Sequence, residues 1–147
     1  MAWLKTRDMR DGVVTNDKLG SRVMHIKKFT YDFSVAGGAI SVITLTDDQG
    51  NAQTLPDNAV LLGATCEVVT GVTSSNAATL DFGYTGDPNY FLNAEAKTSF
   101  DADGKAVKME LSTPTKLTAA KSVVMEIKAY ALTAGKLNVW VRYYQGD

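Results

Sequence analysis

Hydrophobic and polar residues alternate with a period of two along most of the chain, starting near Arg22. A period of two places alternate side chains on one face of a β-strand. The first such run extends from residue 23 to residue 33, and a β-branched run at 40–46 follows a glycine-containing turn at 35–39. The two runs are therefore predicted to pair as a hairpin.

The middle of the chain contains the most apolar segment, residues 59–70, in which both parities are apolar at first and alternation follows. This pattern predicts a central strand that is covered on both faces. Small polar residues at 72–78 indicate a loop, and 79–84 returns to alternation. Residues 90–96 follow a turn at 85–89, and we expect a short helix or a single helical turn there.

The last third of the chain predicts further strands and a long hairpin. Residues 105–111 form an alternating strand with Val107, Met109 and Leu111 inward, and Pro114 keeps the residues after it off a central ladder. Segments 121–132 and 137–144 flank a turn at 133–136 and are predicted to pair. Because no period of 3.6 is sustained, we predict an all-β fold, an antiparallel β-sandwich of jelly-roll form, over residues 22–147.

Residues 1–21 differ from the rest, because charged and amide residues dominate and apolar ones are scattered. We predict that they form an extended N-terminal arm. Trp3 and Leu4 are its apolar tip, and a large aromatic near a polar terminus gains most by docking, either on this domain or on a neighbouring chain.

Composition excludes several classes of function. With 15 Lys and Arg against 16 Asp and Glu, the formal net charge is −1, so no global field attracts nucleic acid or anionic lipid. No apolar run reaches the roughly 20 residues that span a bilayer, and the start of the chain lacks a signal peptide, so we expect synthesis in the cytoplasm. Cys66 stands alone in an apolar run, which indicates an inert buried thiol.

Residues that support catalysis or cofactor binding are sparse. His25 is the only histidine, so metal sites and hydrolase triads lack partners. Asp101 and Asp103 resemble the start of a calcium loop, but Lys105 occupies the next ligand position, which favours a turn; Ca²⁺ would be considered only if oxygens converge there. Glu67 and Asp81 are the acids placed in apolar strands, and we expect both to face outward. No enzyme activity, cofactor or metal is predicted.

The outward face of the predicted C-terminal hairpin is the candidate interaction surface. It comprises Tyr130, Trp140, Arg142 and Tyr144, which are residue types enriched at protein interface hot spots. A second sheet or the N-terminal arm is the alternative cover for these rings. Trp3 and Leu4 complete the set of predicted interaction residues.

Three passages resemble the decoration (cement) proteins and head fibres of tailed bacteriophage capsids. They are Asp11-Gly-Val-Val-Thr-Asn-Asp-Lys-Leu-Gly20, Leu55-Pro-Asp-Asn-Ala-Val-Leu-Leu-Gly-Ala64 and Ala131-Leu-Thr-Ala-Gly-Lys-Leu-Asn-Val-Trp-Val-Arg-Tyr143. The resemblance implies a structural virion protein on the capsid surface, binding the major capsid protein and itself as a homotrimer, with no nucleic acid or membrane partner. The alternative is a carbohydrate- or receptor-binding β-module of a fibre or tail, with the aromatic residues as a stacking platform. A hydrolase would require two carboxylates converging in a cleft.

Overall fold

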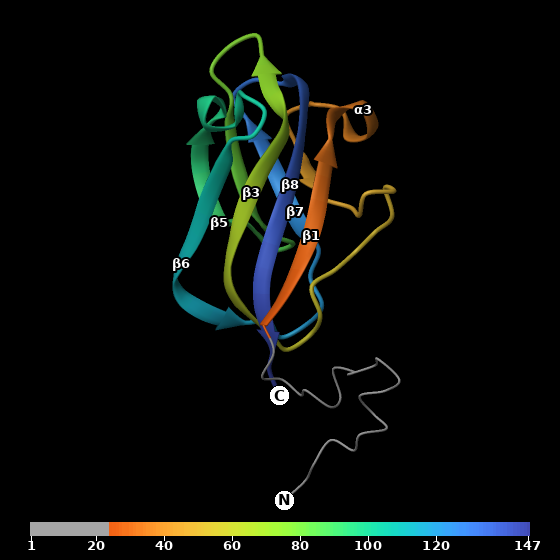
Figure 1. Ribbon diagram of the computed structural model, residues 1–147, viewed down its shortest axis with the longest axis vertical. Coiled ribbons are helices and arrows are strands. Elements are labelled where there is room, and N and C mark those ends of the chain that lie inside the picture. Colours follow the sequence, from red (N-terminus) through yellow and green to blue (C-terminus); the bar gives the residue numbers. More distant parts are fainter. Residues whose placement is uncertain (1–23) are drawn as a thin grey trace, which may run out of the picture.

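The computed structural model describes residues 24–147, which form two four-stranded antiparallel sheets packed face to face (Figure 1). Sheet A has the order β1 (Met24–Asp32), β8 (Leu132–Gln145), β3 (Ala59–Ser74) and β6 (Ala106–Lys116). Sheet B has the order β2 (Val42–Thr44), β7 (Val123–Lys128), β4 (Thr79–Tyr84) and β5 (Asp87–Ala96). Two single-turn helices, α3 (Phe33–Ala36) and η2 (Lys97–Phe100), complete the fold. The predicted all-β sandwich is confirmed, and the predicted arm, with Trp3 and Leu4, lies outside the described residues.

The core lies between the two sheets and follows from the alternation in the sequence. On β8 the inward residues Leu137, Val139 and Val141 are fully buried. Phe82 of β4 and Met125 of β7 are buried in the same way on the facing sheet. Burial of each such side chain contributes about 1.5–3 kcal/mol to the free energy of folding. Because alternate residues share a face, the apolar set of each strand therefore decides which face packs inward.

The predicted central strand is confirmed as β3, which pairs with β8 on one side and β6 on the other. From Ala59 to Cys66, most odd-numbered and even-numbered residues alike are buried. From Glu67 onward, exposed residues alternate with buried ones such as Val68 and Val72. A bulge interrupts both ladders between Leu61 and Gly63, where Gly63 has φ +149°. Only glycine adopts that conformation without strain.

The predicted hairpin of residues 23–33 and 40–46 is wrong, because β1 belongs to sheet A and β2 to sheet B. A single bridge between Thr30 and Thr46 joins these segments. The Asp32 side chain caps α3 by accepting the Ser34 N–H at 2.9 Å, and Gly37 ends the turn at φ +72°. This local turn carries the chain from one sheet to the other instead of folding it back.

The short helix expected at residues 90–96 is also wrong, since this segment lies in β5 and pairs with β4. Gly86, at φ +103°, supports the connecting turn. A Cβ at Gly83 would lie 2.1 Å from the Asp87 carbonyl oxygen, so glycine there permits the close approach of the two strands. The backbone hydrogen bonds of β4 therefore decide the conformation of a segment whose own pattern is ambiguous.

The predicted C-terminal hairpin is wrong as well, because β7 lies in sheet B and β8 in sheet A. The turn predicted at 133–136 is part of β8 itself. The reversal occurs earlier, at Ala129 with φ +69°, and it crosses between the sheets. Gly135 is needed for packing, since a Cβ there would lie 2.8 Å from Cγ2 of Val72 on β3.

Candidate functional site

Trp140, Arg142 and Tyr144 lie on the outer face of sheet A, as their alternation with the buried residues of β8 predicts. Among the described residues no second sheet covers this face, because sheet B packs against the opposite side. In register with these three residues lie Lys28, Ile26 and Met24 of β1. On the other side of β8 lie Thr65, Gly63 and Val60 of β3. We call this surface, made of the nine residues just named, the β8 face.

The bulge in β3 positions Arg142. Its Nη1 donates a hydrogen bond to Oγ1 of Thr65 at 2.9 Å. A Cβ on Gly63 would lie 2.8 Å from Nη2, so the absence of a side chain there lets the guanidinium lie across β3. Arg142 also helps to lower the pKa of the Glu110 carboxyl on β6, after the larger effect of Lys108 at 2.5 Å. The arginine is thus held in place with its planar group at the centre of the face.

Trp140 lies beside a polar network that occupies the end of the face nearest α3. The Lys28 Nζ lies 5.5 Å from the centre of the Trp140 ring, a cation–π distance, and 2.6 Å from Asp48 Oδ2. That contact lowers the pKa of the Asp48 carboxyl. Farther along, the Asn138 side chain donates to Glu67 at 3.0 Å. Lys28 thus partly occupies the ring face that a sugar would need in order to stack.

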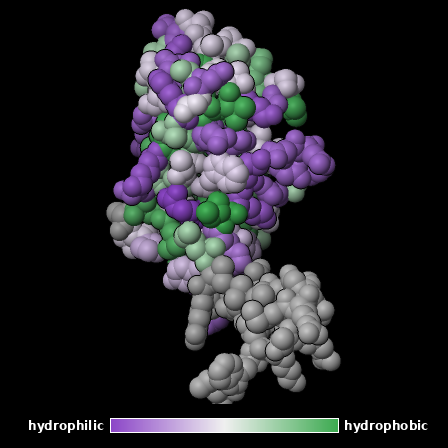
Figure 2. Space-filling model, in the orientation of Figure 1, coloured by the Kyte–Doolittle hydropathy of each residue, from purple (hydrophilic) through white to green (hydrophobic). Residues whose placement is uncertain are grey.

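The other end of the β8 face, where β1 begins and β8 ends, is apolar and open. Met24 is 51% exposed, Ile26 is 56% exposed and Tyr144 is 39% exposed. Figure 2 looks onto sheet A and shows hydrophobic side chains near the lower end of the described sandwich, next to hydrophilic ones. We call this the base end, and the end with α3 the apex end. The contribution of β1 was not predicted, because the sequence pattern does not show that β1 pairs with β8.

Tyr130 does not join this surface. It lies in the connection between β7 and β8, 42% exposed, at the apex end of the sandwich. Tyr144 lies near the opposite end of β8, about 40 Å from Leu132 at 3.3 Å per residue. The grouping of Tyr130 with the other three residues depended on the predicted hairpin and is wrong for the same reason.

The remaining chemical candidates have structural partners. Cys66 is buried between the sheets, and burial raises the pKa of its thiol to about 12. The ring of His25 stacks on Tyr143 with centroids 5.3 Å apart. Asp101 pairs with Lys105 at 2.6 Å, and Asp103 accepts the Gly71 N–H at 2.7 Å. These last two contacts fit the predicted turn.

Of the two acids predicted to face outward, Glu67 is exposed and Asp81 is fully buried. Asp81 accepts the Ala94 N–H at 2.6 Å and forms an ion pair with Lys128. Ala94 has φ +54° at a bulge in β5, so the carboxylate satisfies a backbone group that the bulge removes from the ladder. Sequence reasoning missed this burial because the bulge brings β5 over the carboxylate.

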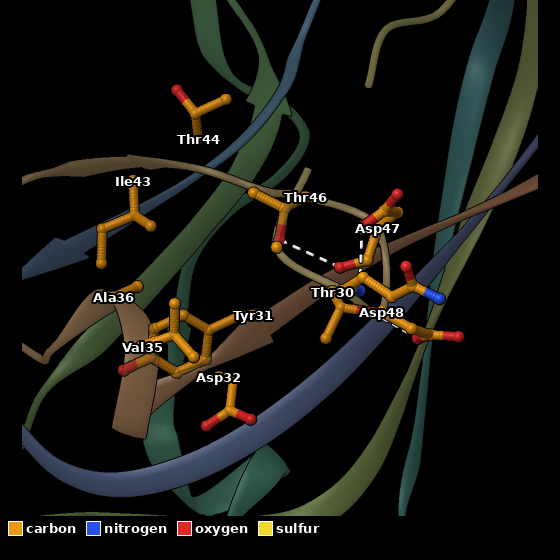
Figure 3. A pocket seen from close by; sticks show the side chains of 12 residues that line it. Thr30, Tyr31, Asp32, Val35, Ala36, Ile43, Thr44, Thr46, Asp47 and Asp48 are labelled. Atoms are coloured by element: carbon orange, nitrogen blue, oxygen red, sulfur yellow. Dashed lines mark hydrogen bonds between the residues drawn. The ribbon is translucent and has the colours of Figure 1, made fainter. Parts of the chain in front are cut away.

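A pocket of about 190 Å³ lies between the end of β1, α3 and the chain leading from β2 to Gly50 (Figure 3). Tyr31, Val35, Ala36 and Ile43 line its apolar part. Asp32, Asp47 and Asp48 line its polar part. Among residues 24–147, no three His, Cys, Asp or Glu side chains are grouped so that they could hold a metal ion. Within the same range, no helix is long and apolar enough to cross a membrane.

Comparison with known proteins identifies the fold. Neither the protein-family models nor the curated proteins contain a match. Among solved structures, the chain is similar to one in the "Acidic stable capsid structure of Helicobacter pylori bacteriophage KHP30", with a TM-score of 0.60 and 22% identity over 85% of this chain and 90% of that one. It is also similar to a chain of the "Cyanophage Pam1 capsid asymmetric unit", with a TM-score of 0.61 and 19% identity over 83% and 84%. At such identities the likeness establishes a shared fold, and function must be argued from surfaces.

Proposed function

We propose that this chain is a structural protein of a bacteriophage virion, a decoration or cement protein that binds the capsid surface and stabilises the head shell. The observation that carries the proposal is the match of most of the chain to chains of two phage capsid structures. The β8 face supports it, because it offers aromatic, aliphatic and arginine side chains on a rigid sheet. Of these side chains, Trp, Tyr and Arg are the types enriched at the hot spots that carry most of the binding energy of protein interfaces.

The proposed mechanism is the addition of buried interface across the shell. A stable interface of standard size buries about 1,600 Å² in total, or about 800 Å² on each partner. The β8 face supplies the sheet contribution, and the N-terminal arm with Trp3 and Leu4 supplies a second contact. The major capsid protein is the proposed partner, with self-association as a homotrimer, and the protein has no catalytic role.

The direct test is binding to phage head shells that lack the protein. Purified protein is mixed with expanded shells, and bound protein is measured by sedimentation at micromolar concentration. The expected result is saturable binding and an increase in the temperature at which the shells disintegrate. A protein that remains a free monomer and leaves the shells unchanged would overturn the proposal.

The alternative is a carbohydrate-binding module that uses Trp140 and Tyr144. The outward position of both rings favours it. The position of Lys28 over Trp140 opposes it, because a neutral sugar would have to displace a cation from the ring. Titration with a glycan panel, read by Trp fluorescence, distinguishes the two functions: a specific change in fluorescence in the absence of shell binding would favour the alternative.

A further inference from the structure

Arg142 occupies the centre of the β8 face. Along β8 it lies between Trp140 and Tyr144, because alternate residues of a strand share a face. Across the sheet it is in register with Ile26 of β1 and Gly63 of β3, the strands on either side of β8 (Figure 1). Both Ile26 and Tyr144 are exposed. A charged group is therefore set among aromatic and aliphatic side chains that a bound partner would remove from water.

Most of the hydrogen-bonding capacity of the Arg142 side chain has no acceptor among the described residues. A guanidinium group carries five N–H donors in a planar fork. Within residues 24–147, its acceptor is Oγ1 of Thr65, at 2.9 Å from Nη1. A buried donor without an acceptor opposes binding, because its hydrogen bonds to water are lost and not replaced. A partner that covers the β8 face must therefore supply acceptors to Arg142.

The charge of Arg142 also has no counter-charge within hydrogen-bonding reach in this range. The ion pairs found within residues 24–147 do not include it. The pKa of the Glu110 carboxyl on β6 is lowered mainly by Lys108, at 2.5 Å, and to a smaller extent by Arg142. A cation that is removed from water without an opposite charge opposes binding strongly. The acceptors that a partner supplies should therefore carry a negative charge.

The geometry at Arg142 fits a carboxylate better than a phosphate. A Cβ at Gly63 would lie 2.8 Å from Nη2, so the glycine lets the guanidinium lie across β3, where Thr65 fixes it. Such a planar fork can hold a carboxylate by two parallel N–H···O bonds. Nucleic acid and anionic lipid are bound by clustered cations, whereas Lys28, the other cation of the β8 face, is paired with Asp48 at 2.6 Å. Arg142 is thus suited to an aspartate or glutamate side chain.

We infer that the partner of the β8 face presents an aspartate or glutamate that forms a bidentate ion pair with Arg142. The inference rests on the proposed function, since it specifies the chemistry of the head-shell surface that this face binds. The aromatic and aliphatic side chains around Arg142 exclude water from the pair. The pair in turn selects against an apolar surface that lacks an acid, because such a surface leaves the arginine uncompensated. Arg142 therefore determines the specificity of the face.

Shell binding by variants at position 142 tests this pairing. Arg142→Gln removes the charge, and its affinity for head shells that lack the protein should fall at least about thirtyfold. Arg142→Lys keeps the charge without the planar fork, and its affinity should fall about fivefold. Urea denaturation of both variants verifies that they remain folded. Unchanged binding of Arg142→Gln would overturn this inference alone, whereas absence of wild-type binding would overturn the capsid proposal and this inference with it.

Zero-length cross-linking identifies the acid of the partner directly. A carbodiimide activates a carboxyl group, and a lysine amine in contact with it forms an amide, with net loss of one water. Shells saturated with Arg142→Lys are treated in this way, digested and analysed by mass spectrometry. The expected product joins position 142 to an aspartate or glutamate of a shell subunit. Tyr130→Lys, at the apex end, is the matched control and should give no product between position 130 and the shell.

Two outcomes of the cross-linking experiment would overturn the inference. One is the absence of any product at position 142 while Arg142→Lys remains bound to the shells. The other is a product that joins position 142 to an acid of this chain, the N-terminal arm included, because the counter-charge would then come from the protein itself and not from the shell.

Discussion

The outer faces of the two sheets differ in what they bury and what they expose. On sheet B, the Asp81 carboxylate is buried beneath the bulge of β5 and paired with Lys128, which also lies 3.6 Å from Glu126. On sheet A, Ile26 and Tyr144 remain open to solvent beside Trp140. Within residues 24–147, sheet B therefore contains a buried, paired carboxylate, with Val42 exposed at its edge, whereas sheet A leaves aliphatic and aromatic side chains of both β1 and β8 exposed side by side.

This difference predicts which face contributes to the stability of the fold and which contributes to binding. The buried Asp81 carboxylate constrains the fold, because its charge is compensated only by Lys128 and by the Ala94 N–H, whereas the 40% exposed Lys128 side chain also reaches solvent. An open apolar and aromatic face contributes little to folding and becomes valuable only when a partner removes it from water. We therefore expect substitutions on sheet B to affect stability and substitutions on the β8 face to affect binding.

The largest expected effect follows from Asp81→Ala. The substitution leaves the Ala94 N–H without its charged acceptor, so we expect a loss of about 2 to 3 kcal/mol in the free energy of unfolding; the exposed Lys128 can be solvated. Urea denaturation followed by Trp fluorescence measures it. Asp81→Asn is the matched control, because it keeps an acceptor for Ala94 and should cost less. A loss below about 1 kcal/mol for Asp81→Ala would remove the contrast between the two faces.

The next effect is on binding and follows from Trp140→Ala. A central aromatic hot spot contributes about 2 kcal/mol, so affinity for head shells should fall roughly 30-fold. Tyr130→Ala is the matched control, because Tyr130 is a partly exposed aromatic at the apex end, away from the β8 face. Equal losses from the two substitutions would argue against the β8 face as the docking surface. Sedimentation with shells provides the measurement.

Much of the fold could be predicted from the sequence, and the failures have a common physical origin. Alternation and apolar runs correctly predicted strands at 23–33, 59–70, 79–84 and 137–144, which lie in β1, β3, β4 and β8, because burial depends on which face each residue occupies. Pairing could not be read in the same way. The segments before and after Ala129 look like a hairpin, yet they belong to different sheets, since a residue at φ +69° redirects the chain without any turn-forming sequence.

The candidate site was likewise predictable within one strand but not across strands. Trp140, Arg142 and Tyr144 were found because one strand and its parity suffice to place them. Tyr130 was grouped with them wrongly because its place depended on pairing. Ile26 was not proposed as a site residue for the same reason, since only the register of β1 with β8 brings it beside Arg142. Surface residues within one strand are thus predictable, but surfaces that cross strands are not.

A smaller effect is expected from Ile26→Ser on the apolar end of the β8 face. Because Ile26 is 56% exposed, the free energy of unfolding should change by no more than about 0.5 kcal/mol. Shell affinity should fall about fivefold, by about 1 kcal/mol, through loss of apolar contact at the interface. Chemical denaturation and shell sedimentation on the same samples measure both quantities. A change in stability that exceeds the change in binding would reverse the roles assigned to the two faces.

The smallest effect concerns the alkaline limit of stability and depends on Lys128. The hydrogen bond to Asp81 raises the pKa of the Lys128 ammonium above its ordinary value. A raised pKa in the folded state means that the stabilisation is complete below the unfolded pKa of about 10.4 and is lost as pH rises through the folded value. The difference in melting temperature between wild type and Lys128→Gln should therefore be constant from pH 7 to 9 and shrink above about pH 10.5. Buried Tyr31 and Cys66, whose pKa values are each raised to about 12, also reduce stability at high pH, but equally in both proteins. A difference that stays constant to pH 12 would show that Lys128 acts on sheet B through packing of its methylene groups and not through its charge.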